Sequence, residues 1–116
     1  MIRRGDIHWV ELDPARGSEA SKRRPAIIVS NDVANLTASR LGRGVVTVVP
    51  VTSNVERIYP FQVALSPGVT GLDRASKAQA EQVRSIDVAR LGAKVGAVPE
   101  SVLTKIDEAL RLHLAL

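Results

Sequence analysis

Most of the chain up to residue 86 consists of short segments rich in β-forming residues, separated by turn residues. Strands are predicted over residues 7–12, 25–30, 45–51 and 60–66, and residues 74–86 supply one or two more. Residues 25–30 are nearly continuously apolar, which indicates a strand buried on both faces. Pro50 cannot donate to a ladder and should therefore lie at an edge or a bulge.

Helical patterns occur at two places. Asn31 or Asp32 can cap a short helix that carries Val33, Ala34 and Leu36. Near the C-terminus, Pro99 opens a longer helix with Leu103, Ile106, Leu110 and Leu114 at helical spacings. We expect that stripe to pack on the sheet or on a second subunit. Strands followed by a terminal helix, without βαβ alternation, predict a mainly β protein with added helices (α+β), most simply a small antiparallel barrel.

Length and composition narrow the class of protein. With 116 residues the chain is expected to be one domain, residues 1–116. There is no cysteine, and no apolar run approaches the ~20 residues that span a membrane. We therefore expect a soluble, unexported, cytoplasmic protein. The net charge is +4, and residues 22–57 alone carry six basic and two acidic side chains, so they either form a patch for a polyanion or are simply solvated.

Several kinds of catalytic site find no support in the sequence. His8 and His113 have no cysteine or carboxylate at ligand spacing, so neither a metal site nor a cofactor is expected. Two polar segments remain as candidates. One is the loop of residues 13–24, which ends in Lys22-Arg23-Arg24 before Pro25, and the other is Thr52-Ser53-Asn54 at a strand end. In a small barrel both can reach one rim.

Such a rim could act on RNA. Arginine offers a planar set of donors suited to phosphate, and a threonine hydroxyl can donate or accept one hydrogen bond. RNA carries its own nucleophile, the 2′-OH, so the protein need only align it and stabilise the developing charge. The alternative is that Arg24 anchors a loop and Thr52 caps a strand end.

Three motifs resemble those of the MazF/PemK toxins. The first comprises Arg4-Gly5-Asp6-Ile7, Asp13-Pro14, Gly17-Ser18-Glu19 and Arg24-Pro25; the second comprises Val49-Pro50-Val51-Thr52-Ser53 and Tyr59-Pro60-Phe61; the third is Glu81-Gln82-Val83-Arg84-Ser85-Ile86-Asp87. Together they cover the chain from about residue 4 to 90.

The resemblance implies the toxin of a type II toxin–antitoxin system, with an SH3-like barrel and a C-terminal helix. It implies a homodimer that cleaves single-stranded RNA, whether mRNA, tRNA or rRNA, sequence-specifically and without metal, and so inhibits translation and growth. It also implies a cognate MazE-type antitoxin whose disordered tail blocks the RNA groove, and operator DNA bound together with that antitoxin.

By position, the resemblance assigns catalysis to Arg24 and Thr52. The RNA-binding candidates are Ser18, Glu19, Lys22, Arg23, Ser53, Asn54, Phe61, Gln62, Glu81 and Gln82. Some PemK-type relatives use an Arg and an Asp in the third motif as acid and base, but here these positions are Gln79 and Glu81, which favours the Arg24/Thr52 version. The PemK-type histidine of the first loop is replaced by Ser18.

Two other functions stay open at this point. One is a nucleic-acid-binding barrel without catalysis, such as a repressor. The other is a gyrase poison of the CcdB type, which would depend on its terminal helix and leave RNA intact. The pair Arg24 and Thr52 favours the ribonuclease, because a protein that only binds has no need of it.

Overall fold

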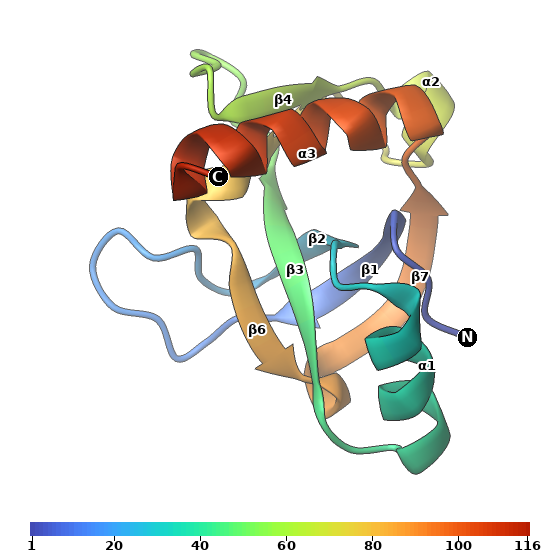
Figure 1. Ribbon diagram of the computed structural model, residues 1–116. Coiled ribbons are helices and arrows are strands. Elements are labelled where there is room, and N and C mark those ends of the chain that lie inside the picture. The colour runs from blue at the N-terminus through green and yellow to red at the C-terminus, as the bar shows by residue number, and fades with distance from the viewer.

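Seven strands form one sheet, and every pairing between them is antiparallel (Figure 1). The computed structural model describes residues 1–116. The strands are β1 (Asp6–Glu11), β2 (Arg23–Ile28), β3 (Val45–Thr52), β4 (Gln62–Leu65), β5 (Ser76–Gln79), β6 (Arg84–Asp87) and β7 (Leu91–Ala97). Their order is β4-β5-β3-β2-β1-β7, and β6 also pairs with β3. The pairing runs from β4 to β7 without returning to its start, so a closed barrel stays a prediction.

Three α-helices and two 3-10 turns connect and cover the strands. They are α1 (Asp32–Leu41), α2 (Pro67–Thr70), α3 (Glu100–Leu114), η1 (Ala80–Gln82) and η2 (Val88–Arg90). The predicted short helix and terminal helix are confirmed, and α2 was not predicted. None of these helices is both long and apolar enough to cross a bilayer.

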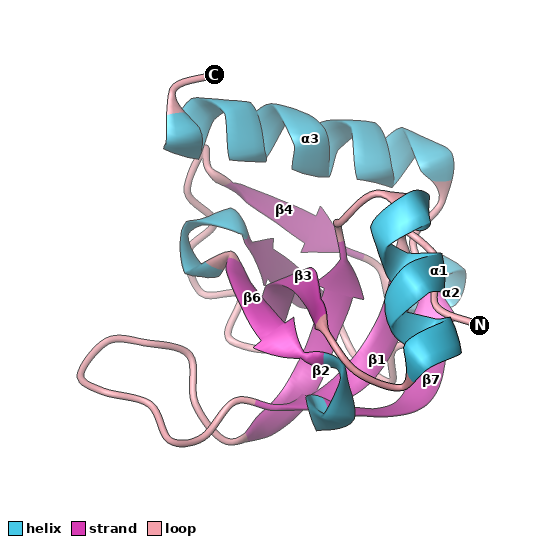
Figure 2. Ribbon diagram, turned by 60° about the horizontal axis from the view of Figure 1, so that its bottom comes forward, coloured by secondary structure: helices cyan, strands magenta, loops and turns pink.

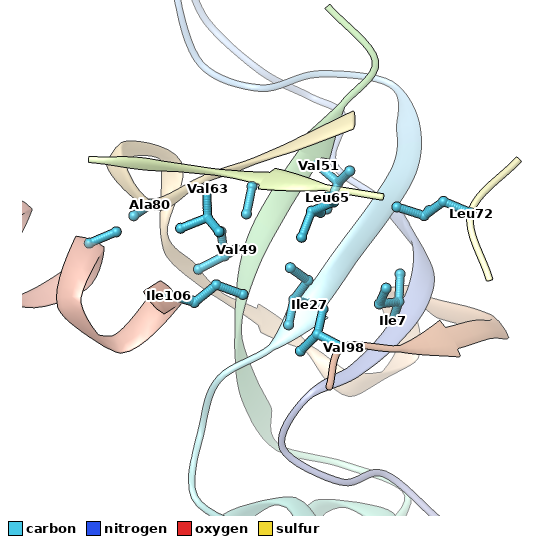
Figure 3. Packing of buried hydrophobic residues seen from close by; sticks show 12 residues of the cluster. Ile7, Ile27, Val49, Val51, Val63, Leu65, Leu72, Ala80, Val98 and Ile106 are labelled. Atoms are coloured by element: carbon cyan, nitrogen blue, oxygen red, sulfur yellow. The ribbon is translucent and has the colours of Figure 1, made fainter. Parts of the chain in front are cut away.

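The centre of the sheet is buried on both faces, and within the predicted residues 25–30 this holds for Ala26, Ile27 and Ile28. Side chains alternate between the two faces of a strand. Ile27 therefore belongs to the core beneath α3, whereas its neighbours Ala26 and Ile28 belong to a second core on the opposite face. In Figure 3 the side chains of Ile27, Val49 and Ile106 turn toward one another in the first of these cores.

The terminal helix packs its apolar stripe on the protein's own sheet, and it lies alongside β4 (Figures 1 and 2). Ile106 is fully buried, and Leu103 and Leu110 are partly buried against the same core. Leu114, the last member of the predicted stripe, is instead exposed. Most of the apolar stripe of α3 thus packs against the sheet, and the C-terminal end of the stripe is exposed.

Capping explains where α1 begins and ends. The side chain of Asn31 accepts a hydrogen bond from the backbone N–H of Ala34 at 2.9 Å, which satisfies one orphan donor of the first turn. Gly42 ends the helix with φ of 63°, a conformation that glycine adopts without steric cost. Within the helix the buried residues are Asn35 and Ala38, whereas Val33 is exposed.

Strands β2, β4 and β7 differ most from the prediction, and β4 covers only Gln62–Leu65 of the expected residues 60–66. β2 begins at Arg23, two residues before the expected start, because Arg23 and Arg24 pair with Glu11 and Val10 of β1. β7 was not predicted at all, since its glycines break any alternation. Gly96 is required there, because a Cβ at this position would come within 2.0 Å of the carbonyl oxygen of Thr70.

Strand β3 has three neighbours, and Pro50 marks the change between two of them. On one edge β3 pairs with β6 up to Val48 and with β5 from Val51 onward. Pro50 lies between these two ladders, where a missing N–H leaves no partner unsatisfied on that edge. Pro50 was expected at an edge or a bulge, but β3 is an interior strand and its register with β2 is continuous at Pro50. The proline is tolerated because it lies at the gap between the β6 and β5 ladders.

Candidate active site

Arg24 and Thr52 lie on neighbouring strands at the same end of the sheet. The register of β2 and β3 pairs Ala26 with Pro50, Ile27 with Val49 and Ile28 with Val48. Continuing this register by two residues sets Arg24 opposite Thr52, and opposite residues of an antiparallel pair project from the same face. The structure thus brings together the two residues that the sequence assigns to catalysis.

Both residues line a pocket of about 310 Å³ at this end of the sheet, here called the Thr52 pocket. Its other lining residues are Trp9, Arg23, Pro25, Val51, Ser53, Leu72, Asp73, Arg74 and Ser76. Arg74 is a cationic member that sequence reasoning missed. It lies in the turn before β5, is exposed and pairs with Asp73 at 3.5 Å, and no motif pointed to it.

The side chain of Arg24 is half-buried and held at one nitrogen. Its Nε donates to the carbonyl oxygen of Ser21 at 2.8 Å, while neither terminal guanidinium nitrogen has a hydrogen-bond partner within the protein. A guanidinium fixed at Nε keeps its two outer nitrogens available for a bidentate contact. Arg23, the preceding residue, projects from the other face and places its guanidinium 4.8 Å from the centre of the Trp9 ring.

Thr52 ends β3 and organises the segment that follows. Its Oγ1 accepts a hydrogen bond from the backbone N–H of Asn54 at 3.2 Å, so the hydroxyl proton is left free to donate. The side chain of Asn54 in turn accepts from the backbone N–H of Glu56 at 3.3 Å. Thr52 therefore does cap the end of its strand, which was the alternative to a catalytic role. This cap is compatible with a contact between the Thr52 hydroxyl and substrate.

The long loop between β1 and β2 projects from the body of the molecule beside this end of the sheet (Figures 1 and 2). Gln82 holds it from both sides, because its amide accepts from the N–H of Ala20 at 2.8 Å and donates to the carbonyl of Ser18 at 2.9 Å. Arg84 donates to the carbonyl of Leu12 at 3.3 Å at the start of the loop. The predicted RNA contact Gln82 is thus placed as a support of the loop.

The exposed tip of this loop carries further predicted RNA contacts. Ser18 and Glu19 are both exposed, and the Glu19 carboxylate accepts from the N–H of Arg16 at 2.8 Å. Lys22 closes the loop with φ of 66°, and its N–H donates to the side chain of Asp13 at 2.9 Å. The Lys22 side chain is exposed, and its ammonium makes no ion pair within the protein.

Three other RNA-binding candidates make contacts within the protein. They are Phe61, Gln62 and Glu81. The amide of Gln62 donates to Glu81 at 2.6 Å and accepts from the N–H of Tyr59 at 3.0 Å. Phe61 stacks on Tyr59 with ring centres 5.4 Å apart. These residues therefore fix the start of β4 and the segment before it, whereas Ser53 and Asn54 are exposed beside the Thr52 pocket.

The basic segment of residues 22–57 does not gather into one patch. Arg43 precedes β3 and Thr52 ends it. A strand of eight residues is roughly 26 Å long, so Arg40 and Arg43 lie far from the Thr52 pocket while Arg23 and Arg24 line it. Neither histidine lines this pocket, and no group of three or more His, Asp and Glu side chains is placed to hold a metal ion.

Comparisons of sequence place the chain among known toxins. Residues 3–114 match the family described as PemK-like, MazF-like toxin of type II toxin-antitoxin system. Endoribonuclease MazF9 of Mycobacterium tuberculosis is 62% identical over 116 residues, covering 100% of this chain and 98% of that protein. Endoribonuclease EndoA of Bacillus subtilis is 31% identical over 117 residues, covering 100% of this chain and 97% of that protein.

Solved structures agree with the sequence comparison. MazF from Deinococcus radiodurans superposes with a TM-score of 0.80 at 27% identity, covering 99% of this chain and 97% of that one. An endoribonuclease in complex with its cognate antitoxin, from a mycobacterial species, gives a TM-score of 0.79 at 25% identity, covering 100% and 97%. The chain therefore belongs to the PemK-like, MazF-like family of toxin endoribonucleases of type II toxin–antitoxin systems.

Proposed function

We propose that this toxin cleaves single-stranded RNA without a metal ion, by in-line attack of the substrate's own 2′-OH. The observation that carries the proposal is that Arg24 and Thr52, on neighbouring strands, line one pocket, with both outer guanidinium nitrogens of Arg24 free of protein partners. A phosphate bound there would meet a fixed cation and a hydroxyl donor from two adjacent strands. These are the groups that stabilise charge as it builds on the phosphate.

Chemistry sets the role of each residue. Arginine has a pKa above ~12, so it is a poor general base, and Arg24 acts as an electrostatic stabiliser or proton donor. Thr52 holds the phosphate or orients the 2′-OH through its free hydroxyl proton. The nucleophile needs alignment with the leaving 5′-oxygen, and the rigid sheet beneath both residues supplies it. The products are a 2′,3′-cyclic phosphate and a 5′-hydroxyl.

The decisive experiment combines a chelator with a modified substrate. Purified protein is incubated with a defined RNA in EDTA, and the fragment ends are identified by mass spectrometry. We expect a 2′,3′-cyclic phosphate on the 5′ fragment, and no cleavage when the nucleotide 5′ of the cut carries a 2′-deoxyribose. Cleavage of the deoxy substrate would rule out 2′-OH attack. RNA that is bound and left intact would instead indicate a binding protein, and RNA that is neither bound nor cut would favour a protein target.

We also propose a cognate MazE-type antitoxin as partner and a homodimer as the assembly. Support for the first comes from solved relatives described as complexes with an antitoxin, from a mycobacterial species and from Deinococcus radiodurans. Support for the second is the exposure of Leu112, Leu114 and Leu116 at the end of α3, since apolar groups on a small domain favour association. Sedimentation showing only monomer at micromolar concentration would contradict the dimer.

A further inference from the structure

A buried lysine lies next to the proposed catalytic pair. Strand β5 separates β3 from β4, and its Lys77 pairs with Thr52 on one side and with Ala64 on the other. Register partners project from the same face with Cβ atoms ~5 Å apart. Lys77 therefore shares a face with Thr52 and, one strand further, with Arg24, whereas its neighbour Ala78 turns into the core beneath α3.

The surroundings of this lysine are unusual for a cation. Lys77 is only 7% exposed, yet no carboxylate lies within ion-pair distance of its ammonium group. Its single hydrogen bond is donated to the carbonyl oxygen of Arg57 at 2.6 Å. An ammonium has three donors, and a buried charge without a counter-ion is costly, so lysines are rarely buried unpaired. The group thus has capacity for an anion that the protein itself does not supply.

The ammonium group opens onto a cavity adjoining the Thr52 pocket. This second cavity, of about 510 Å³, is lined by Asn54, Glu56, Arg57, Tyr59 and Lys77. Ser53 lines the first pocket and the next residue, Asn54, lines the second, so the segment that follows β3 leads from one cavity to the other. Tyr59 forms an aromatic wall, with the Arg57 guanidinium 5.1 Å and the Lys77 ammonium 6.0 Å from its ring centre. A polynucleotide leaving the Thr52 pocket on this side would pass through this second cavity.

We propose that Lys77 binds an RNA phosphate adjacent to the one that is cut, extending the substrate site into the second cavity. This rests on the proposed function, because it takes RNA as the substrate. The Lys77 ammonium already donates one hydrogen bond to an oxygen atom, the Arg57 carbonyl. A phosphate oxygen would accept from the remaining N–H donors of the ammonium. Bound phosphate would also supply the counter-charge that the buried ammonium lacks.

The alternative is a purely structural role, in which Lys77 only holds the segment between β3 and β4 in place through its hydrogen bond to Arg57. Three variants separate the two: Lys77→Met keeps the length without the charge, Lys77→Arg keeps the charge, and Lys105→Met removes an exposed charge on α3 as a control. Binding to an RNA blocked at the cut by a 2′-deoxyribose is measured across a range of salt concentrations. Each phosphate contact to a single strand contributes ~0.7 to the slope of log affinity against log salt.

We expect Lys77→Met to lower that slope by ~0.7, and we expect Lys77→Arg and Lys105→Met to keep it. Single methylphosphonates, which are uncharged, are then placed at each phosphate in turn. One of the two positions flanking the cut should weaken wild-type binding while leaving Lys77→Met binding unchanged, as a coupled pair requires. Should Lys77→Met fail to fold, Lys77→Gln replaces it, and the wild-type scan must still show a sensitive flanking phosphate.

An unchanged slope in folded Lys77→Met, or equal sensitivity of that variant and the wild type at every phosphate, would overturn the Lys77 assignment while leaving the Arg24/Thr52 proposal intact. Loss of cleavage chemistry in the wild type would have the opposite meaning, since the blocked RNA reports binding alone. A wild-type protein that binds no RNA at all would overturn both.

Discussion

The middle and the end of the β2–β3 pair share one register but have opposite compositions. In the middle, Ile27 and Val49 face each other with no exposed surface. Three positions further along the same register, Arg24 comes opposite Thr52, and both are half-buried. The same ladder thus passes from a water-free core to a pocket lined by donors, without any loop between them.

This difference assigns separate tasks to adjacent residues. A site built on the end of a core strand inherits the rigidity of the core, which keeps its donors within the narrow geometry that catalysis requires. Substitutions in the middle should therefore change the free energy of unfolding, and substitutions at the end should change turnover. Each of the following experiments tests whether that separation holds.

The largest effect is expected for Ile27→Ala, in the middle of the ladder. Removing a fully buried isoleucine side chain leaves a cavity and should lower the free energy of unfolding by ~2–5 kcal/mol. Urea unfolding followed by circular dichroism measures this. The exposed Val33→Ala serves as control and should change stability by less than ~0.5 kcal/mol. If the folded fraction of Ile27→Ala also cleaved RNA far more slowly than the wild type, the two tasks would not be separate.

At the end of the ladder, Arg24→Ala should act on turnover. Loss of one preorganised donor lowers the rate by about 10²–10³, or ~2.7–4 kcal/mol. Binding of a blocked RNA should stay within about tenfold of the wild type. Single-turnover kinetics and a binding titration measure the two quantities.

Arg23→Ala and Lys22→Ala are the controls for Arg24, since Arg23 also lines the Thr52 pocket but places its guanidinium on the Trp9 ring, and Lys22 closes the loop. Both should show the milder binding phenotype, with a salt slope lower by up to ~0.7. Near-normal cleavage by Arg24→Ala, or failure that is due only to lost binding, would contradict the assignment of this active site.

An intermediate effect is expected from exchanging methyl and hydroxyl groups at two successive positions. Thr52→Val removes the free hydroxyl and should slow cleavage by roughly 10–10²-fold, the worth of a hydrogen bond to a charged group. Val51→Thr places a hydroxyl in the core, where Val51 is 2% exposed, and should cost about 1–3 kcal/mol of stability. Thr52→Val should unfold like the wild type. A reversal of these two phenotypes would show that the faces are assigned wrongly.

The smallest effect concerns Asp32, remote from the pocket. The backbone N–H of Arg4 donates to its carboxylate at 2.7 Å and the Asn35 amide donates at 3.2 Å, which hold the pKa of Asp32 below its ordinary value of 3.8. A lowered pKa means that the carboxylate stabilises the fold above pH 3.8, and that this contribution is lost as the pH falls through the lower folded-state pKa. Asp32→Asn should therefore be less stable than the wild type near neutral pH, with the difference shrinking in acid.

Unfolding of this variant at several pH values, with exposed Glu108→Gln as control, measures the effect. RNA cleavage should not change, because Asp32 lies at the start of α1 and not at the Thr52 pocket. A difference from the wild type that stays constant down to strongly acidic pH would contradict the role of these hydrogen bonds.

Sequence reasoning was strongest where one residue decides the local structure. Asn31 and Gly42 delimit α1 by capping chemistry that acts over a few residues, and the apolar run of residues 25–30 contains the buried part of β2. The juxtaposition of Arg24 and Thr52 was expected only as two strand ends reaching one rim. Their direct opposition depends on a register that no local signal fixes.

Long-range contacts were the part that could not be predicted. Gln82 supports a loop more than sixty positions away in the sequence, and nothing in its own neighbourhood indicates that its amide bonds Ser18 and Ala20. Lys77 lies in a short, polar-looking segment, and its burial follows only from the way the segment before β4 folds over β5. The glycine-rich segment of β7 shows no strand pattern of its own, and only its contacts with neighbouring segments determine that it forms a strand.

The pairing of β1 with β7 joins Asp6 to Ala97, 91 positions apart in the sequence. During synthesis β1 therefore cannot pair with β7 until β7 has been made. The loop beside the active site likewise cannot be held in place until Gln82 and Arg84 have been made. Contacts so distant in sequence form late and slowly. A nascent chain would thus not yet be a finished nuclease, because the loop beside the active site has no support until Gln82 and Arg84 have been made.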